Sequence, residues 1–156
     1  MKKYLVIGNP IDHSLSPLLH NFWIKKHNIK AIYEKKLLEK KDIEKTINDM
    51  KDNKIQGINV TVPFKNLVIP FLDELSDIAR KTQSVNTIFK RKNRLVGDNT
   101  DVYGFTEAIK LTSFDPKDKT VLILGAGGVV PSIILALKNM GTLELILSNR
   151  TKQKAE

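Results

Sequence analysis

The chain has 156 residues, of which 41% are apolar and 28% charged, with a net charge of +9 and no cysteine. This length suits one compact domain and part of a second, and the absence of cysteine excludes disulfides, thiolate metal sites and a cysteine nucleophile. The lysines are scattered and do not alternate with aromatic residues, which favours solvated faces or a phosphate-bearing ligand over a nucleic-acid partner.

Short apolar runs and helical patterns alternate from the N-terminus. The apolar runs predict strands over residues 4–8, 31–38, 57–62, 85–91 and 94–97, the last two joined by a tight turn at Lys92-Asn93. Helices are predicted over residues 16–27, 42–52 and 73–81, and a short one from Lys65 to Ile69 that Pro70 interrupts. Ser16 and Asp42 are the expected N-caps, with Pro17 at the first helical position.

The run after Met1-Lys2-Lys3 ends at Gly8-Asn9-Pro10 and is too short for a signal peptide. No stretch approaches the roughly 20 apolar residues of a membrane span. We therefore expect a cytoplasmic protein without a membrane partner.

Lys65 and Asp101 form a candidate chemical pair. Pro63 ends the strand predicted over residues 57–62. Lys65 therefore lies just beyond the carboxyl end of that strand, where ligands usually bind in α/β sheets. Asp101 opens a helix, where its side chain can cap the helix or face a ligand. Reduction of a carbonyl needs a proton donor at the oxygen, which a lysine beside a carboxylate could supply. From spacing alone, a surface salt bridge is the alternative.

The C-terminal part begins a nucleotide-binding unit. Residues 111–119 are predicted as a loop at a domain boundary, followed by a strand over 120–124, the glycine turn 125–128, a helix over 129–140 and a strand over 143–147. Glycines at 125 and 127 let backbone amides approach a pyrophosphate. Val130 replaces the third glycine of G-x-G-x-x-G, so a purely structural turn is the alternative. The fold class is α/β, with a mainly parallel sheet and then the first βαβ of a Rossmann-like domain.

Charge after the last strand bears on the choice of cofactor. An NAD site usually carries Asp or Glu there, whereas this chain has Arg150, followed by Lys152 and Lys154. Arg150 can pair with a 2′-phosphate, which favours NADP, although a solvated loop arginine is the alternative. No metal is expected. His20 and His27 are interpreted as helix-surface residues, and His13 could border a ligand.

Six segments together resemble the shikimate dehydrogenase family, the NADP-dependent enzymes of aromatic amino-acid biosynthesis. They occur in the family's order across the whole chain: Gly-Asn-Pro-Ile-Asp-His-Ser-Leu-Ser-Pro at 8–17, Asn-Val-Thr-Val-Pro-Phe-Lys at 59–65, Ser-Val-Asn-Thr at 84–87, Gly-Asp-Asn-Thr-Asp at 97–101, Gly-Ala-Gly-Gly at 125–128 and Asn-Arg-Thr at 149–151.

The resemblance implies roles for individual residues. The implied substrate-binding residues, for shikimate or 3-dehydroshikimate, are Ser14, Ser16, Thr61, Lys65, Asn86 and Asp101. Lys65 would exchange the proton, with Asp101 as its partner. The implied NADP-binding residues are Asp77, Gly125, Ala126, Gly127, Gly128, Val129, Asn149, Arg150, Thr151 and Lys154.

The resemblance also implies a domain division, with a shikimate-binding catalytic domain over residues 1–101 and an incomplete NADP-binding domain over 102–156. Val130-Pro131 departs from the family pattern and puts one cofactor contact in doubt. We expect the chain to be a fragment that is inactive alone. An NAD-dependent quinate/shikimate dehydrogenase, a non-catalytic shikimate-binding module and a homodimer are left open.

Overall fold

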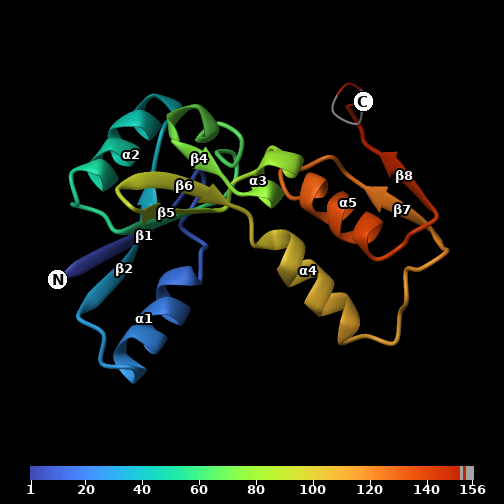
Figure 1. The fold of residues 1–156 in the computed structure, drawn as a ribbon, viewed down its shortest axis with the longest axis horizontal. Helices are drawn as coiled ribbons and strands as arrows, with labels where there is room; N and C mark the ends of the chain where they lie inside the picture. The colour runs from blue at the N-terminus through green and yellow to red at the C-terminus, as the bar shows by residue number, and fades with distance from the viewer. Residues whose placement is uncertain (152, 154–156) are drawn as a thin grey trace.

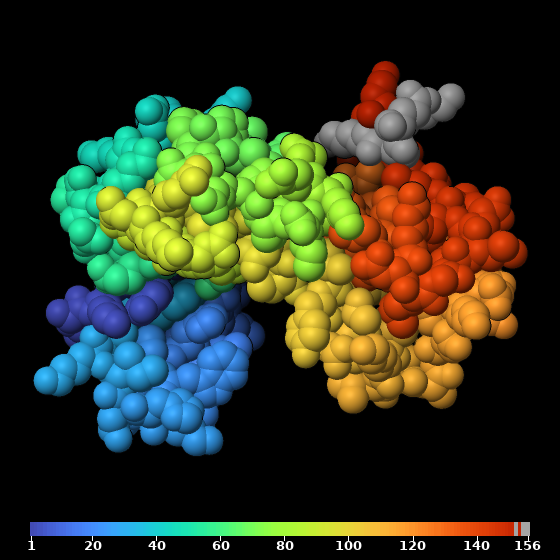
Figure 2. Space-filling view, viewed as in Figure 1, coloured from blue at the N-terminus to red at the C-terminus, as the bar shows by residue number. Residues whose placement is uncertain are grey.

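The computed structural model describes residues 1–151 and 153, which form two β-sheets flanked by helices (Figure 1). The larger sheet has six strands in the order β2-β1-β3-β5-β6-β4, and the smaller sheet pairs β7 with β8. The space-filling view shows two lobes joined at the centre, one built on each sheet (Figure 2).

The elements of the larger lobe are β1 (Lys2–Gly8), α1 (Ser16–Lys26), β2 (Ala31–Leu37), η1 (Lys40–Asp42), α2 (Ile43–Lys51), β3 (Gly57–Val60), η2 (Ile69–Phe71), β4 (Glu74–Leu75), α3 (Asp77–Thr82), β5 (Thr87–Arg91) and β6 (Arg94–Asp98). Then follow α4 (Asp101–Lys110), β7 (Thr120–Leu124), α5 (Val130–Asn139) and β8 (Glu144–Ser148). This order confirms the α/β class.

The large sheet is mainly parallel. Strand β1 runs parallel to β2 and β3, and β4 runs parallel to β6, whereas β5 is antiparallel to β3 and β6. The chain therefore leaves β1, β3 and β6, and enters β5, at the same edge of the sheet. Side chains from four separate segments can meet at that edge.

Helix α2 covers one face of this sheet. Ile43, Ile47 and Met50 follow helical spacing and are at most 1% exposed. They pack in one cluster with strand residues that include Ile7 and Ile58. Each such side chain contributes roughly 1.5–3 kcal/mol when it is fully buried, so this cluster supplies much of the stability of the sheet.

Helix α1 lies on the other face and is held partly by polar contacts (Figure 1). The Asn21 side chain donates to the Tyr33 carbonyl at 2.8 Å and accepts from the Tyr33 amide at 3.0 Å. It thereby pairs with the free side of the edge strand β2. Leu15 is the N-cap of this helix, so Ser16 is its first helical residue, and the Ser16 amide donates to Ser14 Oγ. The prediction of Ser16 as the N-cap was wrong.

The predicted helix over 73–81 was also wrong in its first half. Glu74 and Leu75 form β4, and the helix begins only at Asp77, after Ser76. The Asp73 carboxylate accepts from the Leu95 amide at 2.7 Å, which holds the segment against β6. Helical spacing alone did not reveal this contact with a distant strand.

Two smaller expectations also changed. The segment after Lys65 forms turns and then the 3₁₀ helix η2 that contains Pro70, in place of a short α-helix. Asp42 is the N-cap residue of α2 as predicted, but its carboxylate accepts from the Glu39 amide at 3.4 Å and not from the helix. Local hydrogen bonds in the preceding turn compete for it.

The smaller lobe contains β7, α5 and β8, and α5 packs against α4. Strand β7 has the predicted bounds, α5 is shorter by one residue at each end than predicted, and residues 111–119 contain neither helix nor strand. Burial alternates along both strands, so that Leu122, Leu124 and Ile146 are exposed on one face. Among the described residues, no helix is both long enough and apolar enough to span a membrane.

Two glycines test the packing of the large sheet. A Cβ at Gly97 would lie 2.5 Å from Leu72 Cδ1 and 2.9 Å from Val85 Cγ2, whereas one at Gly104 in α4 would have no atom within 4 Å. Gly97→Ala should therefore destabilise the protein by about 1–3 kcal/mol through overpacking. Gly104→Ala, the control, should stabilise it by about 0.5–1 kcal/mol through helix propensity. Urea unfolding measures both, and equal effects would contradict this packing.

Candidate active site

Lys65 and Asp101 meet at the shared edge of the large sheet. Lys65 Nζ lies 2.5 Å from Asp101 Oδ2, and the two side chains are 13% and 23% exposed. The pair is therefore largely shielded from water, unlike the surface salt bridge that spacing alone left open. Removal of one partner would leave a poorly hydrated charge, which is costly.

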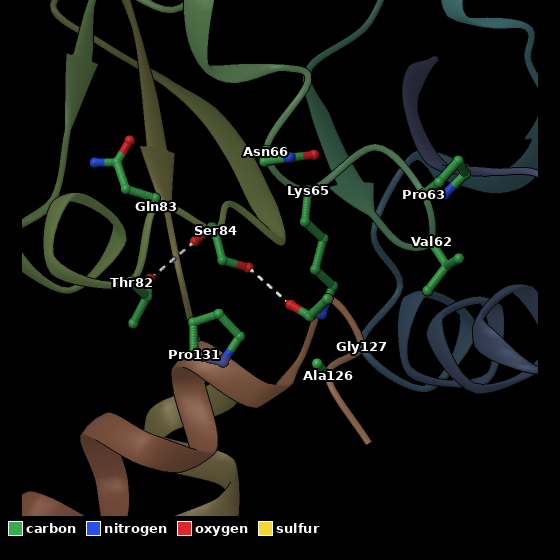
Figure 3. Close-up of a pocket in the computed structure, with 11 residues that line it drawn as sticks. Val62, Pro63, Lys65, Asn66, Thr82, Gln83, Ser84, Ala126, Gly127 and Pro131 are labelled. Atoms are coloured by element: carbon green, nitrogen blue, oxygen red, sulfur yellow. Dashed lines mark hydrogen bonds between the residues drawn. The ribbon is translucent and has the colours of Figure 1, made fainter. Parts of the chain in front are cut away.

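The loop after β3 holds Lys65 in place. Phe64 and Val68 on either side of it are 2% and 0% exposed, so they anchor the loop in the core. The Lys65 carbonyl also accepts from the Val85 amide at 2.8 Å. With its backbone held in this way, the lysine side chain extends from the sheet edge toward the smaller lobe (Figure 3).

Asp101 lies in the first turn of α4, and a neighbour takes over the capping. Asn99 Oδ1 accepts from the amides of Asp101 at 2.9 Å and Val102 at 3.4 Å. The Asp101 carboxylate therefore does not cap the helix and instead faces Lys65. The structure thus excludes the capping role that the sequence left open for Asp101, while its role toward a ligand stays a prediction.

Asn86 holds the other oxygen of the carboxylate. Its Nδ2 donates to Asp101 Oδ1 at 2.9 Å, and its Oδ1 accepts from the Thr100 amide and the Thr87 hydroxyl, both at 3.0 Å. These contacts define which end of the amide faces Asp101. Asn86 thus orients the carboxylate toward Lys65.

The hydrogen bonds continue from Asn86 into the sheet. The Thr87 hydroxyl accepts from Asn59 Nδ2 at 3.2 Å, and the Tyr33 hydroxyl donates to Asn59 Oδ1 at 2.7 Å. Burial raises the pKa of Tyr33 well above its ordinary value. The sequence analysis assigned no role to Asn59 or Tyr33. For Asn59, the signal available in the sequence was a polar residue between the apolar residues Ile58 and Val60.

His20 stacks on the Tyr33 ring, with centroids 4.2 Å apart, and its burial lowers the pKa of His20. His20 is partly exposed on α1, which agrees with its interpretation as a helix-surface residue, and His13 and His27 are exposed.

The other expected substrate residues lie at the same edge. Thr61 follows β3 and adjoins Gly8 at the end of β1, where an added Cβ would lie 2.6 Å from Thr61 Cγ2. Ser14 and Ser16 lie beyond β1, and the Ser16 amide donates to Ser14 Oγ at 3.3 Å. All three are partly exposed. Within the described part of the chain, no hydrogen bond joins either serine to Lys65 or Asp101, so their roles remain predictions.

A cleft of about 560 Å³ separates the loop that carries Lys65 from the glycine turn (Figure 3). It is lined by Val62, Pro63, Lys65, Asn66, Thr82, Gln83, Ser84, Ala126, Gly127, Gly128 and Pro131. Across it, the Ser84 hydroxyl donates to the Gly128 carbonyl at 3.3 Å. The two lobes are therefore linked at the wall of this cleft.

The glycine turn has the geometry of an anion site. Gly125 has φ +108°, and an added Cβ at Gly125, Gly127 or Gly128 would meet no atom within 4 Å apart from those of its chain neighbours. Within residues 1–151 and 153, the amides of Gly127, Gly128 and Val129 have no hydrogen-bond acceptor. Open space and unpaired amides before a helix fit a pyrophosphate. Pro131, at the start of α5, offers no further amide.

The end of β8 is tied to this turn. Asn149 Oδ1 accepts from the Ala126 amide at 3.2 Å, and Asn149 Nδ2 donates to the Thr151 carbonyl at 2.7 Å. Arg150 is exposed between them. Asp77 is exposed at the first position of α3, and Lys154 lies outside the described residues.

Comparison with known proteins identifies the family. Residues 6–88 match the family model of the shikimate dehydrogenase substrate-binding domain. The chain belongs to this family. It is 58% identical over 154 residues to the shikimate dehydrogenase (NADP(+)) of Pelagibacter ubique, an alignment that covers 99% of this chain and 58% of the relative. The chain thus spans a little over half the length of such relatives.

Solved shikimate dehydrogenases share the fold of the whole chain. The Aquifex aeolicus enzyme is 39% identical with a TM-score of 0.93, covering 99% of this chain and 58% of that one. The Thermus thermophilus enzyme, in complex with NADP(H) and shikimate, is 34% identical with a TM-score of 0.88, over the same shares of the two chains. The resemblance inferred from the six segments is confirmed.

The buried hydroxyl of Tyr33, at the end of the hydrogen bonds that run from Asn86 through Asn59, makes the free energy of unfolding depend on pH. Below about pH 10, Tyr33→Phe should cost about 1–2 kcal/mol, because Asn59 Oδ1 loses its donor. The folded state retains the Tyr33 proton where the unfolded state releases it, so this advantage should fade by roughly 1.4 kcal/mol per pH unit above about pH 10. Urea unfolding at several pH values measures the difference. Tyr103→Phe, at a residue that is 68% exposed, is the control, and a pH-independent difference for Tyr33→Phe would contradict the effect of burial.

Proposed function

We propose that this chain supplies the substrate-binding lobe and the start of the cofactor lobe of an NADP-dependent enzyme that interconverts 3-dehydroshikimate and shikimate. The observation that carries the proposal is the shielded Lys65–Asp101 pair, whose lysine faces the glycine turn across one cleft. The family relationship supports the choice of substrate.

Lys65 carries the proposed proton transfer. Reduction of a ketone places negative charge on its oxygen, and an ammonium group at that atom can donate the proton. Asp101 orients the ammonium group and, with Asn86, keeps it at the edge of the sheet. When bound, NADPH would supply the hydride. In the reverse direction, Lys65 accepts the proton of the shikimate hydroxyl.

The remaining residues at the sheet edge bind the substrate in this proposal. The Ser14 and Ser16 hydroxyls hold its carboxylate, while Thr61, Asn86 and Asp101 hold its ring hydroxyls. The loops after β1, β3 and β6 and the loop before β5 reach the same edge, which supports this assignment.

On the cofactor side, the residues from Gly125 to Val129 hold the pyrophosphate, and Asn149, Arg150, Thr151 and Lys154 hold the 2′-phosphate, with Asp77 nearby. The open glycine turn supports the first part. The exposed Arg150 and the lack of Asp or Glu in residues 149–155 support the second. The division between residues 101 and 102 and a cytoplasmic location belong to the same proposal.

An NAD-dependent enzyme is the second candidate. The shikimate 5-dehydrogenase of Listeria monocytogenes, solved in complex with shikimate and NAD, is 28% identical to this chain, with a TM-score of 0.88. Comparison of kcat/KM for shikimate and quinate, each with NADP and with NAD, distinguishes the candidates.

Lys65→Ala tests the chemistry in the complete protein that carries this chain. Loss of the proton donor should lower kcat by roughly 10²–10⁴-fold, whereas KM for 3-dehydroshikimate should change much less, because the other polar contacts remain. Oxidation of NADPH followed by absorbance measures both. Lys90→Ala, which removes contacts to Lys51 and Asn53, is the control. An unchanged kcat would remove Lys65 from the chemistry, and calorimetric shikimate binding without wild-type turnover would indicate a binding module.

Arg150→Ala tests the choice of cofactor. Loss of a charge-assisted contact to the 2′-phosphate should raise KM for NADPH roughly ten- to hundredfold and leave KM for NADH nearly unchanged. Arg91→Ala, whose guanidinium pairs with Glu74, is the matched control. Equal effects on the two cofactors would assign Arg150 to general charge and not to the 2′-phosphate.

A further inference from the structure

Asn99 is a buried polar residue that the proposed chemistry does not use. Its side chain is 2% exposed and lies between β6 and α4. Its Nδ2 donates to the Ser84 carbonyl at 2.8 Å, to Ser132 Oγ at 2.9 Å and to Thr82 Oγ1 at 3.3 Å. The amide nitrogen is therefore anchored on both lobes.

The other end of the same amide holds the backbone of Asp101. Asn99 Oδ1 accepts from the amides of Asp101 and Val102, the first two residues that follow Thr100 at the start of α4. A flipped amide would point its oxygen at the Ser84 carbonyl and its nitrogen at two N–H donors. Only the observed orientation satisfies both sides.

The Ser132 contact extends this link to the helix behind the glycine turn. Ser132 is fully buried in α5. Ser84, whose carbonyl anchors Asn99, also donates its hydroxyl to Gly128 within the turn. Asn99 thus joins the residue that faces Lys65 to the segment that forms the opposite wall of the cleft.

We infer that Asn99 is a positioning residue, which caps α4 so that the Asp101 carboxylate is left to face Lys65 and which holds this pair in register with the glycine turn. The inference rests on the proposed function for its kinetic consequence. Alanine cannot reach any of the partners, and aspartate can accept from α4 but presents a carboxylate to the Ser84 carbonyl. An amide at this position meets both requirements.

The kinetic test uses Asn99→Asp in the complete protein, at a concentration of folded enzyme determined by circular dichroism. At pH 8, kcat should fall roughly ten- to hundredfold. KM for 3-dehydroshikimate should stay within about threefold of the wild-type value, since the other substrate contacts remain. The deficit in kcat should narrow as pH falls, because a protonated carboxyl can again donate to the Ser84 carbonyl. Thr106→Ala, which removes a hydroxyl bonded within α4, is the control.

A deficit that does not change with pH, or a kcat that stays at the wild-type value, would overturn the inference. A parallel loss of folded protein and activity, with normal turnover per folded molecule, would make Asn99 merely structural and would also overturn it.

A second readout does not depend on turnover. Acylation of Lys65, followed by mass spectrometry, should become roughly tenfold faster in Asn99→Ala and Asn99→Asp, because the reagent reacts with a neutral amine and a displaced Asp101 no longer holds Lys65 Nζ in the ion pair. Lys36, which donates to Thr46 Oγ1 at 3.0 Å, is the internal control and should not change. Unchanged acylation of Lys65 in folded variants overturns the inference. Faster acylation in a protein whose wild type lacks turnover supports the positioning role and refutes the proposed function.

Discussion

The ion pair between Lys65 and Asp101 is the interaction on which the candidate site depends. Its atoms lie 2.5 Å apart although they come from separate strand ends. Because both side chains are largely shielded, each charge relies on the other more than on water. Asn86 holds the carboxylate and Asn99 holds the backbone behind it. These contacts thus fix the position of Lys65, the lysine that is proposed to transfer the proton.

The mixed sheet explains how such a pair can form. Parallel pairing brings the ends of β1 and β3 to one edge, and the β5–β6 hairpin returns the chain to that edge twice. The residues there are consequently held by core packing and by strand pairing, while their polar ends remain partly exposed. A substrate at this edge would meet hydroxyl, amide and charged groups from four loops, which suits a small molecule with several oxygens.

The link between the lobes bears on the proposed function. In the proposed reaction, hydride and proton would reach neighbouring atoms of one substrate, so the proton donor and the cofactor site would need a defined relative position. The Ser84–Gly128 and Asn99–Ser132 hydrogen bonds connect the two walls of the cleft. In this fold, the same short segment before β5 contributes to the carboxylate contact, to the contacts between the lobes and, in the proposed function, to substrate binding. A change there can affect all three.

Much of this protein was determined by local sequence. The strand over 120–124, the helix that follows the glycine turn and the hairpin at Lys92-Asn93, where both residues have positive φ, all followed from residue spacing and turn chemistry. The six segments also sufficed to indicate the family. These features depend on neighbours in the chain, which a sequence displays directly.

The tertiary structure decided the rest. The short strand β4 exists because Asp73 and its neighbours contact β6, and Asp101 faces Lys65 because Asn99 caps α4 in its place. The series of hydrogen bonds that runs from Asn86 through Thr87 and Asn59 to Tyr33 likewise joins residues that are far apart in sequence. Local propensity carries no information on such partners, since a side chain selects among hydrogen bonds only when packing has brought the candidates together.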